Sequence, residues 1–267
     1  MPDQTLLDEL LALALDAARE AGALLRDGRP ADLGVAATKS SPVDVVTEMD
    51  LASEKLIVEL ITGRRPRDGY LGEEGTERPT ESGVRWIVDP LDGTVNYLYG
   101  QPNWGVSVAA EVDGEVVVGV VAAPVRRELF QAVLGRGAQL DGRPIGTRPT
   151  PPWGQALVAT GFNYVQPVRV HQAEVLHRLM PELRDIRRGG AAAIDLCDLA
   201  AGRLDGYYER GLAPWDLAAG GLIAREAGAL TGGRPGAAAS GELVVAAAPG
   251  VFETLQARLE ELGAWHD

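Results

Sequence analysis

The spacing of apolar residues predicts two helices in the first quarter of the chain. Over residues 5–26 the apolar side chains recur at intervals of three and four, at Leu6, Leu10, Leu13, Ala17, Ala21 and Leu24. That period is typical of an amphipathic helix, and Gly28 and Pro30 follow it as stop signals. Thr47 is the expected N-cap of a second helix, in which Asp50 takes the third position. Its predicted inner face consists of Ala52, Leu56 and Leu60.

Short apolar runs in the middle of the chain predict strands. They cover residues 84–88, 106–112, 115–121 and 129–134. Asp113 and Gly114 separate two of these runs and form the strongest hairpin signal in the chain. Asp141 and Gly142 predict another turn. Meandering strands after two helices indicate an α+β first half with an antiparallel component.

The second half alternates between strands and helices. Strands are predicted at 156–160, 204–208 and 243–247, and helices at 170–179, at 191–201, from Pro214 and from Pro249. This order is typical of an α/β arrangement. Clustered prolines between Gly146 and Gly154 suit a linker, so we expect one domain over residues 1–148 and a second over residues 149–267.

The central strand ends in two acids. Residues 86–96 read WIVDPLDGTVN, and the proline turns the chain so that Asp89 and Asp92 can face one small volume. Gly93 allows a close approach of the backbone to a ligand, and the amides of Gly93 and Thr94 open a predicted helix whose N-terminus attracts anions. Carboxylates beside an anion site suggest bound Mg²⁺. Asp-Pro and Asp-Gly are also ordinary turn sequences, which leaves a structural role open for this segment alone.

Two further acids come from distant parts of the chain. Glu73 and Glu74 lie between glycines, where an extended backbone lets only one of them face inward, and Asp216 follows Pro214 at a predicted helix start. If these acids lay beside Asp89 and Asp92, each pair of like charges 4 Å apart would repel by roughly 4 kcal/mol at an effective dielectric constant of 20. Only cations make such a cluster tenable. Oxygen ligands select Mg²⁺ or Mn²⁺ over Zn²⁺, and the histidines lack the spacing of zinc sites.

Composition narrows the partners and the compartment. A net charge of −13 and a pI near 4.7 argue against a general binder of nucleic acid or of anionic membranes. Cys197 is the single cysteine, so no internal disulfide can form. The sequence carries neither a signal peptide nor an apolar run long enough to span a bilayer. We therefore expect a cytoplasmic protein.

Three motifs, in this order, carry a resemblance to a known family. They are GEE at residues 72–74, WIVDPLDGTVN at 86–96 and WDLAAG at 215–220. Together they resemble the signatures of the inositol monophosphatase family of Mg²⁺-dependent, lithium-sensitive phosphatases, and the resemblance extends from the first helix to the last. It implies a layered αβαβα sandwich, a homodimer, two or three Mg²⁺ ions per site with Mn²⁺ as a substitute, and hydrolysis of a small phosphate monoester.

The resemblance also implies roles for single residues near the metals. The metal ligands would be Glu73, Asp89, the carbonyl of Leu91, Asp92 and Asp216. Thr94 and Asp50 would orient the attacking water, with Glu73 helping through its metal.

The substrate would contact a second set of residues. These are Asp92, the amides of Gly93 and Thr94, the loop of Gly190, Ala191 and Ala192, and the acid Glu209. Lys39 and Asp44 match a loop of the family that closes over the site. Ala191 departs from the family pattern, which often has Ser or Thr there.

The choice of substrate stays open at this point. The leading interpretation is inositol monophosphate or a similar polyol phosphate. Histidinol phosphate, fructose 1,6-bisphosphate or a 3′-phosphonucleotide would need other groups at the pocket mouth, such as a basic cluster or an aromatic platform. Arg187 and Arg188 either serve a second phosphate or are solvated, and one of Tyr207 and Tyr208 is expected to face the core. A regulatory binding module that keeps the fold is the alternative of a different class.

Overall fold

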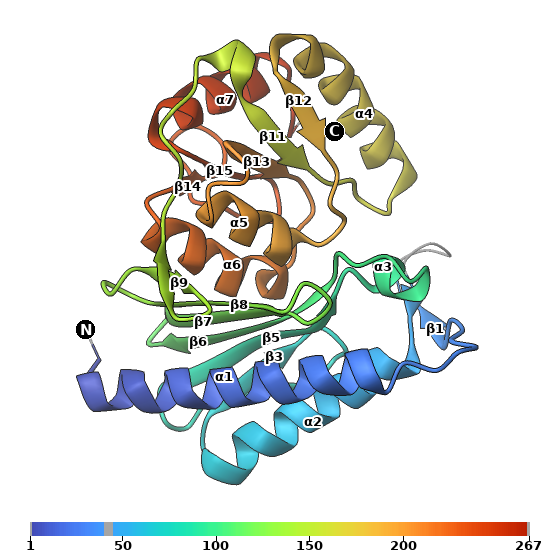
Figure 1. The fold of residues 1–267 in the computed structure, drawn as a ribbon, viewed down its shortest axis with the longest axis vertical. Helices are drawn as coiled ribbons and strands as arrows, with labels where there is room; N and C mark the ends of the chain where they lie inside the picture. The colour runs from blue at the N-terminus through green and yellow to red at the C-terminus, as the bar shows by residue number, and fades with distance from the viewer. Residues whose placement is uncertain (1, 40–44, 266–267) are drawn as a thin grey trace.

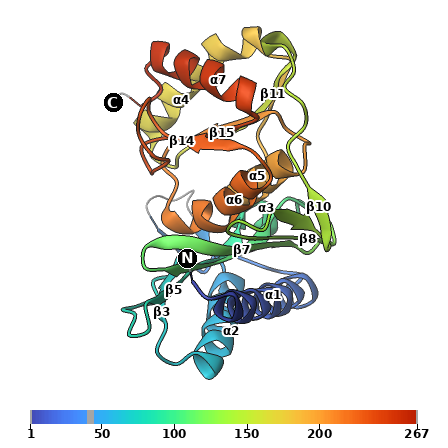
Figure 2. The same ribbon diagram turned by 90° about the vertical axis from the view of Figure 1, so that its left-hand side faces the viewer.

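The chain folds into five layers in which helices and sheets alternate. The computed structural model describes residues 2–39 and 45–265. Helices α1 (Gln4–Asp27) and α2 (Glu48–Arg64) form one outer layer, and α4 (Gln166–Leu179) and α7 (Pro249–Glu261) form the other. Helices α5 (Ala192–Ala200) and α6 (Pro214–Glu226) lie between the two large sheets (Figures 1 and 2). This is the αβαβα sandwich that the three motifs imply.

The first sheet has eight strands. In order across the sheet they are β10 (Arg143–Ile145), β9 (Ala138–Leu140), β8 (Glu128–Val133), β7 (Glu115–Ala123), β6 (Gly105–Val112), β5 (Val84–Asp92), β3 (Gly69–Gly72) and β4 (Glu77–Arg78). The predicted hairpin joins β6 to β7. Strands β3 and β5 run parallel, so the carboxyl ends of both strands lie at the same edge of the sheet. That pairing brings the turn after Gly72 beside the acids at the end of β5.

The second sheet has five strands. Their order is β12 (Asp185–Arg187), β11 (Leu157–Thr160), β13 (Gly206–Glu209), β15 (Val244–Ala247) and β14 (Leu230–Gly232). Strand β11 is parallel to both of its neighbours, whereas β15 is antiparallel to β13 and to β14. Helices cover both faces of the sheet, so Tyr207 and Tyr208 are both buried, where one buried side chain was expected.

Short elements complete the described part of the chain. They are β1 (Ala37–Thr38), β2 (Val45–Val46), α3 (Thr94–Leu98) and two 3-10 turns at Trp153–Gln155 and Met180–Glu182. The expected domain boundary at residue 148 falls between the strands of the two large sheets, and the division into two domains stays a prediction. Within the described residues, no helix combines the length and the apolar character needed to cross a membrane.

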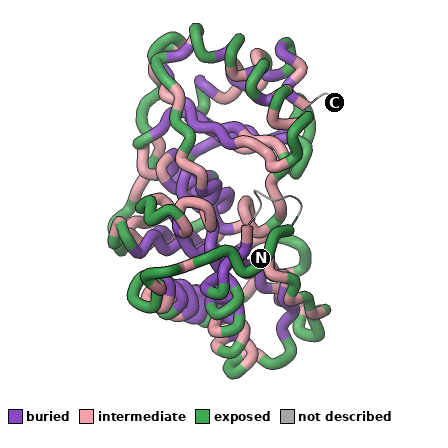
Figure 3. The backbone as a smooth tube through the Cα atoms, turned by 90° about the vertical axis from the view of Figure 1, so that its right-hand side faces the viewer, coloured by how far each residue is buried: buried purple, intermediate pink, exposed green. Residues whose placement is uncertain are grey.

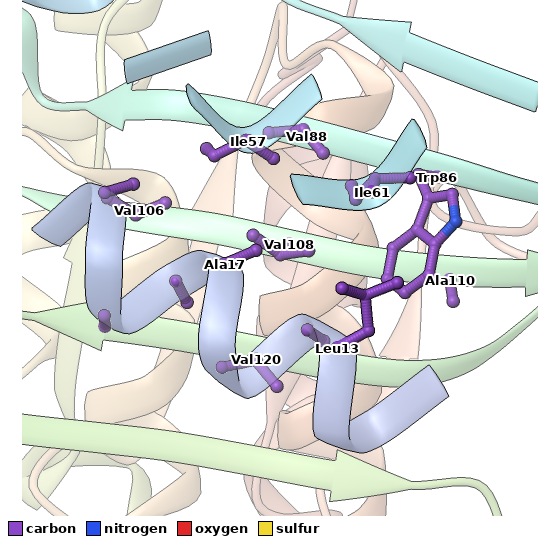
Figure 4. Packing of buried hydrophobic residues seen from close by; sticks show 14 of the residues in the cluster. Leu13, Ala17, Ile57, Ile61, Trp86, Val88, Val106, Val108, Ala110 and Val120 are labelled. Atoms are coloured by element: carbon purple, nitrogen blue, oxygen red, sulfur yellow. The ribbon is translucent and has the colours of Figure 1, made fainter. Parts of the chain in front are cut away.

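Helix α1 packs on the first sheet through the face that its sequence period predicts. Leu10, Leu13, Ala17 and Ala21 are fully buried or nearly so, and Gly28 caps the helix by donating its N–H to the Leu24 carbonyl at 2.8 Å. Figure 4 shows Leu13 and Ala17 above the strands, beside Trp86, Ile57 and Ile61. Small side chains at this contact allow the helix to lie close to the sheet.

The predicted inner face of α2 is wrong. Ala52 is exposed and Leu56 and Leu60 are half-buried, whereas the buried side chains are Met49, Asp50, Ser53, Glu54, Ile57 and Ile61. Three of the buried positions are polar, so the spacing of apolar residues pointed to the face beside the one that is buried. These polar side chains hydrogen-bond to segments at the edge of the sheet, as described below.

The middle layer covers the opposite face of the first sheet. Ile194 and Cys197 of α5 and Ile223 of α6 belong to the same apolar cluster as Val121 and Phe130 of the sheet. Figure 3 shows stretches of buried chain, in purple, in both sheets and in this layer. The two helices therefore have no broad solvent-facing side, and their positions are fixed by packing on both sheets.

Replacement of Ile57 by Ala tests this packing. Ile57 is fully buried between α2 and the sheet, so the substitution should lower the free energy of unfolding by about 2–5 kcal/mol through lost burial and a residual cavity. Urea unfolding monitored by circular dichroism measures the change. Leu51→Ala on the same helix, at a residue that is 50% exposed, is the matched control and should cost less than about 0.5 kcal/mol.

Candidate active site

One cavity of about 260 Å³ lies where several elements end or begin. Strand β5 ends there, the turn after β3 borders it, and α3, α5 and α6 begin there. The predicted site residues that line it are Lys39, Glu73, Asp89, Leu91, Asp92, Gly93, Thr94, Gly190, Ala191, Ala192, Glu209 and Asp216. Asp50 lies behind the wall, and Asp44 is outside the described residues.

Asp50 connects helix α2 to the wall of the cavity. Its Oδ2 accepts the Thr47 N–H at 2.9 Å and completes a capping box at the start of the helix. Its Oδ1 accepts the Thr94 hydroxyl at 2.9 Å. Burial raises the pKa of Asp50. Asp50 therefore has two roles, because it caps helix α2 and also orients the Thr94 side chain in the cavity.

Asp92 joins the end of β5 to the first turn of α5. Its two carboxylate oxygens accept the N–H groups of Ala192 at 3.2 Å and Ala193 at 2.8 Å. Ala191 occupies the N-cap position of α5 and has no side-chain group to cap it. Asp92 supplies the acceptors that a Ser or Thr at that position would supply in part. This explains how the helix tolerates alanine where the family often has a hydroxyl.

Lys39 bridges the two acids of the turn after β3. Its Nζ lies 2.8 Å from Glu73 Oε1 and 2.8 Å from Glu74 Oε1. Both carboxylates reach the same ammonium group, but only one acid of the pair faces the cavity, as predicted. Glu73 lines the cavity, whereas Glu74 is covered by its neighbours and only 4% exposed at the side chain. Burial lowers the pKa of Lys39, but the two carboxylates outweigh burial and the net pKa is raised.

Buried acids repel one another at the floor of the cavity. Burial raises the pKa of Asp89 well above its usual value, and the charges of Glu73, Asp92 and Asp216 raise it further. Burial also raises the pKa of Asp216, to which Glu73 and Asp92 add. The pKa of Asp92 is raised to about 7, chiefly by burial. A bound cation would favour the charged form of each acid and reverse these shifts.

The oxygen atoms of these residues are of the kind that binds a hard cation. In this structure, however, several of the carboxylates contact other protein groups. Carboxylate oxygens and a backbone carbonyl are ligands that Mg²⁺ prefers. Within residues 2–39 and 45–265, no group of three or more His, Cys, Asp or Glu side chains stands close enough to hold a metal ion. Glu73 pairs with Lys39, Asp92 caps α5, and Asp216 Oδ2 accepts the Ala213 N–H at 2.6 Å. Ligation therefore requires these carboxylates to turn toward a shared ion.

The opposite wall is polar and comes from the second sheet. Glu209, at the end of β13, accepts the Tyr207 hydroxyl at 2.6 Å through Oε2. A Cβ at Gly161 would lie 2.0 Å from the same oxygen, so the glycine leaves room for the Glu209 carboxylate in its present position. Burial raises the pKa of Glu209. The wall can accept hydrogen bonds from hydroxyl groups of a ligand.

Several lining residues were not among those predicted. They are Val45, Gly161, Phe162, Asn163, Tyr164, Arg210, Gly211, Leu212, Ala213 and Trp215, together with Arg188, for which two roles were left open. Arg188 lines the cavity and stabilises the charged form of Glu209, whereas Arg187 pairs with Asp185 outside it. Residues 161–164 follow the end of the parallel strand β11. Ligands of α/β folds bind beyond the carboxyl ends of parallel strands, and this rule could have identified these residues from the sequence.

Comparison with known proteins agrees with this arrangement. The profile of the Inositol monophosphatase family matches residues 6–263. Inositol-1-monophosphatase SuhB of Mycobacterium tuberculosis (strain ATCC 25618 / H37Rv) is 43% identical, over 94% of this chain and 93% of that protein. Nus factor SuhB of Pasteurella multocida (strain Pm70) is 39% identical, over 93% of this chain and 95% of that protein.

A solved structure gives the same result for the fold. The crystal structure of extragenic suppressor protein suhB from Bartonella henselae matches with a TM-score of 0.89 at 36% identity. The match covers 95% of this chain and 99% of that one. Sequence and structure thus agree over nearly the whole length, and the chain belongs to the inositol monophosphatase family.

Proposed function

We propose that the protein is a Mg²⁺-dependent phosphomonoesterase that hydrolyses inositol monophosphate or a similar small polyol phosphate. The observation that carries the proposal is the cavity itself: acids from four separate segments line it beside Thr94, whose hydroxyl is held by Asp50. A protein that only binds a partner has no physical need for such mutually repelling groups. Family membership supports the same reaction class.

The proposed metal ligands are the carboxylates of Glu73, Asp89, Asp92 and Asp216 and the carbonyl of Leu91. Magnesium, when bound, would supply the positive charge that lowers the pKa of water and neutralises the leaving oxygen. Mn²⁺ would substitute, since it prefers the same oxygen ligands. Two or three ions per site remain our expectation from the resemblance.

Protein groups would position the reactants around these ions. Thr94 donates its hydroxyl hydrogen to Asp50 or to the Leu91 carbonyl, 3.1 Å away, which leaves its oxygen lone pairs free to accept a proton from water. As that proton reaches the Thr94 oxygen, the Thr94 hydroxyl proton would pass to the Asp50 carboxylate, whose negative charge favours the transfer. The amides of Gly93 and Thr94 would hold the phosphate, because Gly93 has a φ of 88° that brings the backbone to the cavity.

The polar wall would select the alcohol part of the substrate. Glu209 and the loop of Gly190, Ala191 and Ala192 would contact its hydroxyl groups, while Lys39 and Asp44 belong to the loop expected to close over the site. Arg188 gives specific support to a substrate with a second anionic group, so fructose 1,6-bisphosphate and 3′-phosphonucleotides stay in the panel with histidinol phosphate.

A second candidate role is the binding of a macromolecular partner. It is favoured by relatives whose name is Nus factor SuhB, and it is compatible with catalysis by the same chain. The homodimer, the cytoplasmic location and the two domains also stay predictions.

Phosphate release tests the proposed function. The panel consists of inositol 1-phosphate, histidinol phosphate, fructose 1,6-bisphosphate and 3′-phosphoadenosine 5′-phosphate, each with Mg²⁺ and with EDTA. We expect release only with Mg²⁺ and fastest from a polyol monophosphate. Equal rates with EDTA would remove the metal from the mechanism.

Asp92→Asn should abolish nearly all Mg²⁺-dependent turnover and leave the protein folded. The amide keeps one acceptor for the first turn of α5 but loses the charge that a cation needs. We expect at least about a 100-fold fall in kcat/KM, as for other groups that stabilise transition-state charge. Asp113→Asn, in the exposed turn between β6 and β7, is the control and should keep wild-type rates. Normal phosphate release by Asp92→Asn would contradict its assigned role.

Asp89→Asn should stabilise the metal-free protein. The raised pKa of Asp89 means that the folded state binds more protons than the unfolded state, so its contribution to stability is lost as pH rises above about 4. The neutral amide removes that loss, and Tm in EDTA at pH 7.5 should rise by about 2–4 °C per kcal/mol relieved. The gain should vanish near pH 4, and Mg²⁺ should no longer raise Tm. A lower Tm of the variant at pH 7.5 would argue against repulsion at this position.

A further inference from the structure

Helix α2 presents three buried polar side chains to the edge of the first sheet. Asp50 and Ser53 are 0% exposed and Glu54 is 4% exposed. Each contacts a different segment of the cavity wall: Asp50 holds Thr94, and the Ser53 hydroxyl donates to the Pro90 carbonyl at 2.8 Å. Buried polar groups in a helix interior destabilise the fold unless they are hydrogen-bonded, so each contact has a definite role in placing its segment.

Glu54 contacts the segment that carries Glu73. Its Oε2 accepts the Glu74 N–H at 2.9 Å and its Oε1 accepts the Thr76 N–H at 3.1 Å. Both oxygens of one carboxylate thus serve backbone amides of a single turn. Such charge-assisted bonds are roughly twice as strong as neutral ones, and here they are shielded from water.

The same turn is fixed from the side of the sheet. Glu73 donates its N–H to the Val88 carbonyl at 3.2 Å, and Gly72 donates its N–H to the Thr76 carbonyl at 2.8 Å. A Cβ at Gly72 would lie 2.4 Å from Glu54 Oε2, so the glycine makes room for the carboxylate. The backbone of Glu73 is held between β5 and α2, and the remaining freedom is in its side chain.

We propose that Glu54 is a positioning residue that sets the affinity of the cavity for its cation by fixing the Glu73 turn. The proposal rests on the proposed function only in taking Glu73 as a metal ligand. A carboxylate is required because the turn offers two N–H donors to two acceptors, whereas a glutamine offers one acceptor and turns an N–H₂ donor toward the second amide. Glu54 touches neither substrate nor cation in this scheme.

Hydrogen exchange on the metal-free protein tests the contact without any ligand. In the wild type, the amides of Glu74 and Thr76 should exchange at least about 100-fold slower than free-chain amides, although they lie in a turn. In Glu54→Gln at least one of them should exchange about tenfold faster, while amides in the centre of β5 keep their wild-type rates. Free-chain exchange of both amides in the wild type would overturn the proposal, whether or not the variant folds.

Cation affinity tests the consequence. Calorimetric titration with Mg²⁺ in the absence of substrate should give a Kd raised about 10- to 100-fold in Glu54→Gln, the usual cost of removing an outer contact to a metal ligand. The Mg²⁺ concentration for half-maximal phosphate release should shift by the same factor, with kcat at saturating Mg²⁺ within threefold of wild type. A purely structural role would lower Tm and leave the Kd of the folded protein unchanged.

Glu59→Gln is the matched control. It lies on the same helix, its side chain is 65% exposed, and its carboxylate lies 4.0 Å from the Lys55 ammonium group. The control should keep wild-type exchange rates and Mg²⁺ affinity. An unchanged Kd in folded Glu54→Gln would overturn the proposal. If the wild type binds Mg²⁺ but releases no phosphate, the proposed function is wrong. The role of Glu54 would then still be decided by the Mg²⁺ titration and the hydrogen exchange.

Discussion

The fold of the cavity depends on one carboxylate shared between two layers. Asp92 belongs to the end of β5, yet both of its oxygens accept N–H groups from the first turn of α5. Helix α5 is packed between the two large sheets, so this contact fixes the acidic strand end relative to the loop of Gly190 and Ala191. A buried acid with a raised pKa persists here because each of its oxygens accepts a backbone N–H.

Helix α2 is the second constraint. A helix that packed only through apolar side chains would hold the sheet but leave the turn after β3 and the end of β5 free to shift. Ser53 and Glu54 remove that freedom through backbone groups on both segments. Because three buried positions of α2 are polar, this helix buries less apolar surface than a helix with an apolar inner face. Helix α1, whose buried face is apolar, packs on the same sheet and contributes that burial.

The five-layer sandwich and most of the predicted lining residues followed from the resemblance to the family. From its local patterns alone, the sequence predicted an α+β first half and an α/β second half, and it marked Asp89, Asp92 and Asp216 through turn and helix-start signals. It failed where tertiary contacts decide. Strand β3 was missed because four residues with two glycines carry no strand signal, and the inner face of α2 was missed because Ser53 and Glu54 look solvent-facing. The bridge from Lys39 to both Glu73 and Glu74 joins residues far apart in sequence, so no local pattern predicts it.

The middle layer has a consequence for the way the chain is made. The face of the first sheet that carries Val121 and Phe130 is covered by α5 and α6, which are synthesised after every strand of that sheet. When only the first sheet has left the ribosome, the nascent chain therefore exposes the apolar face that α5 and α6 later cover. Such a partly folded chain is prone to aggregation.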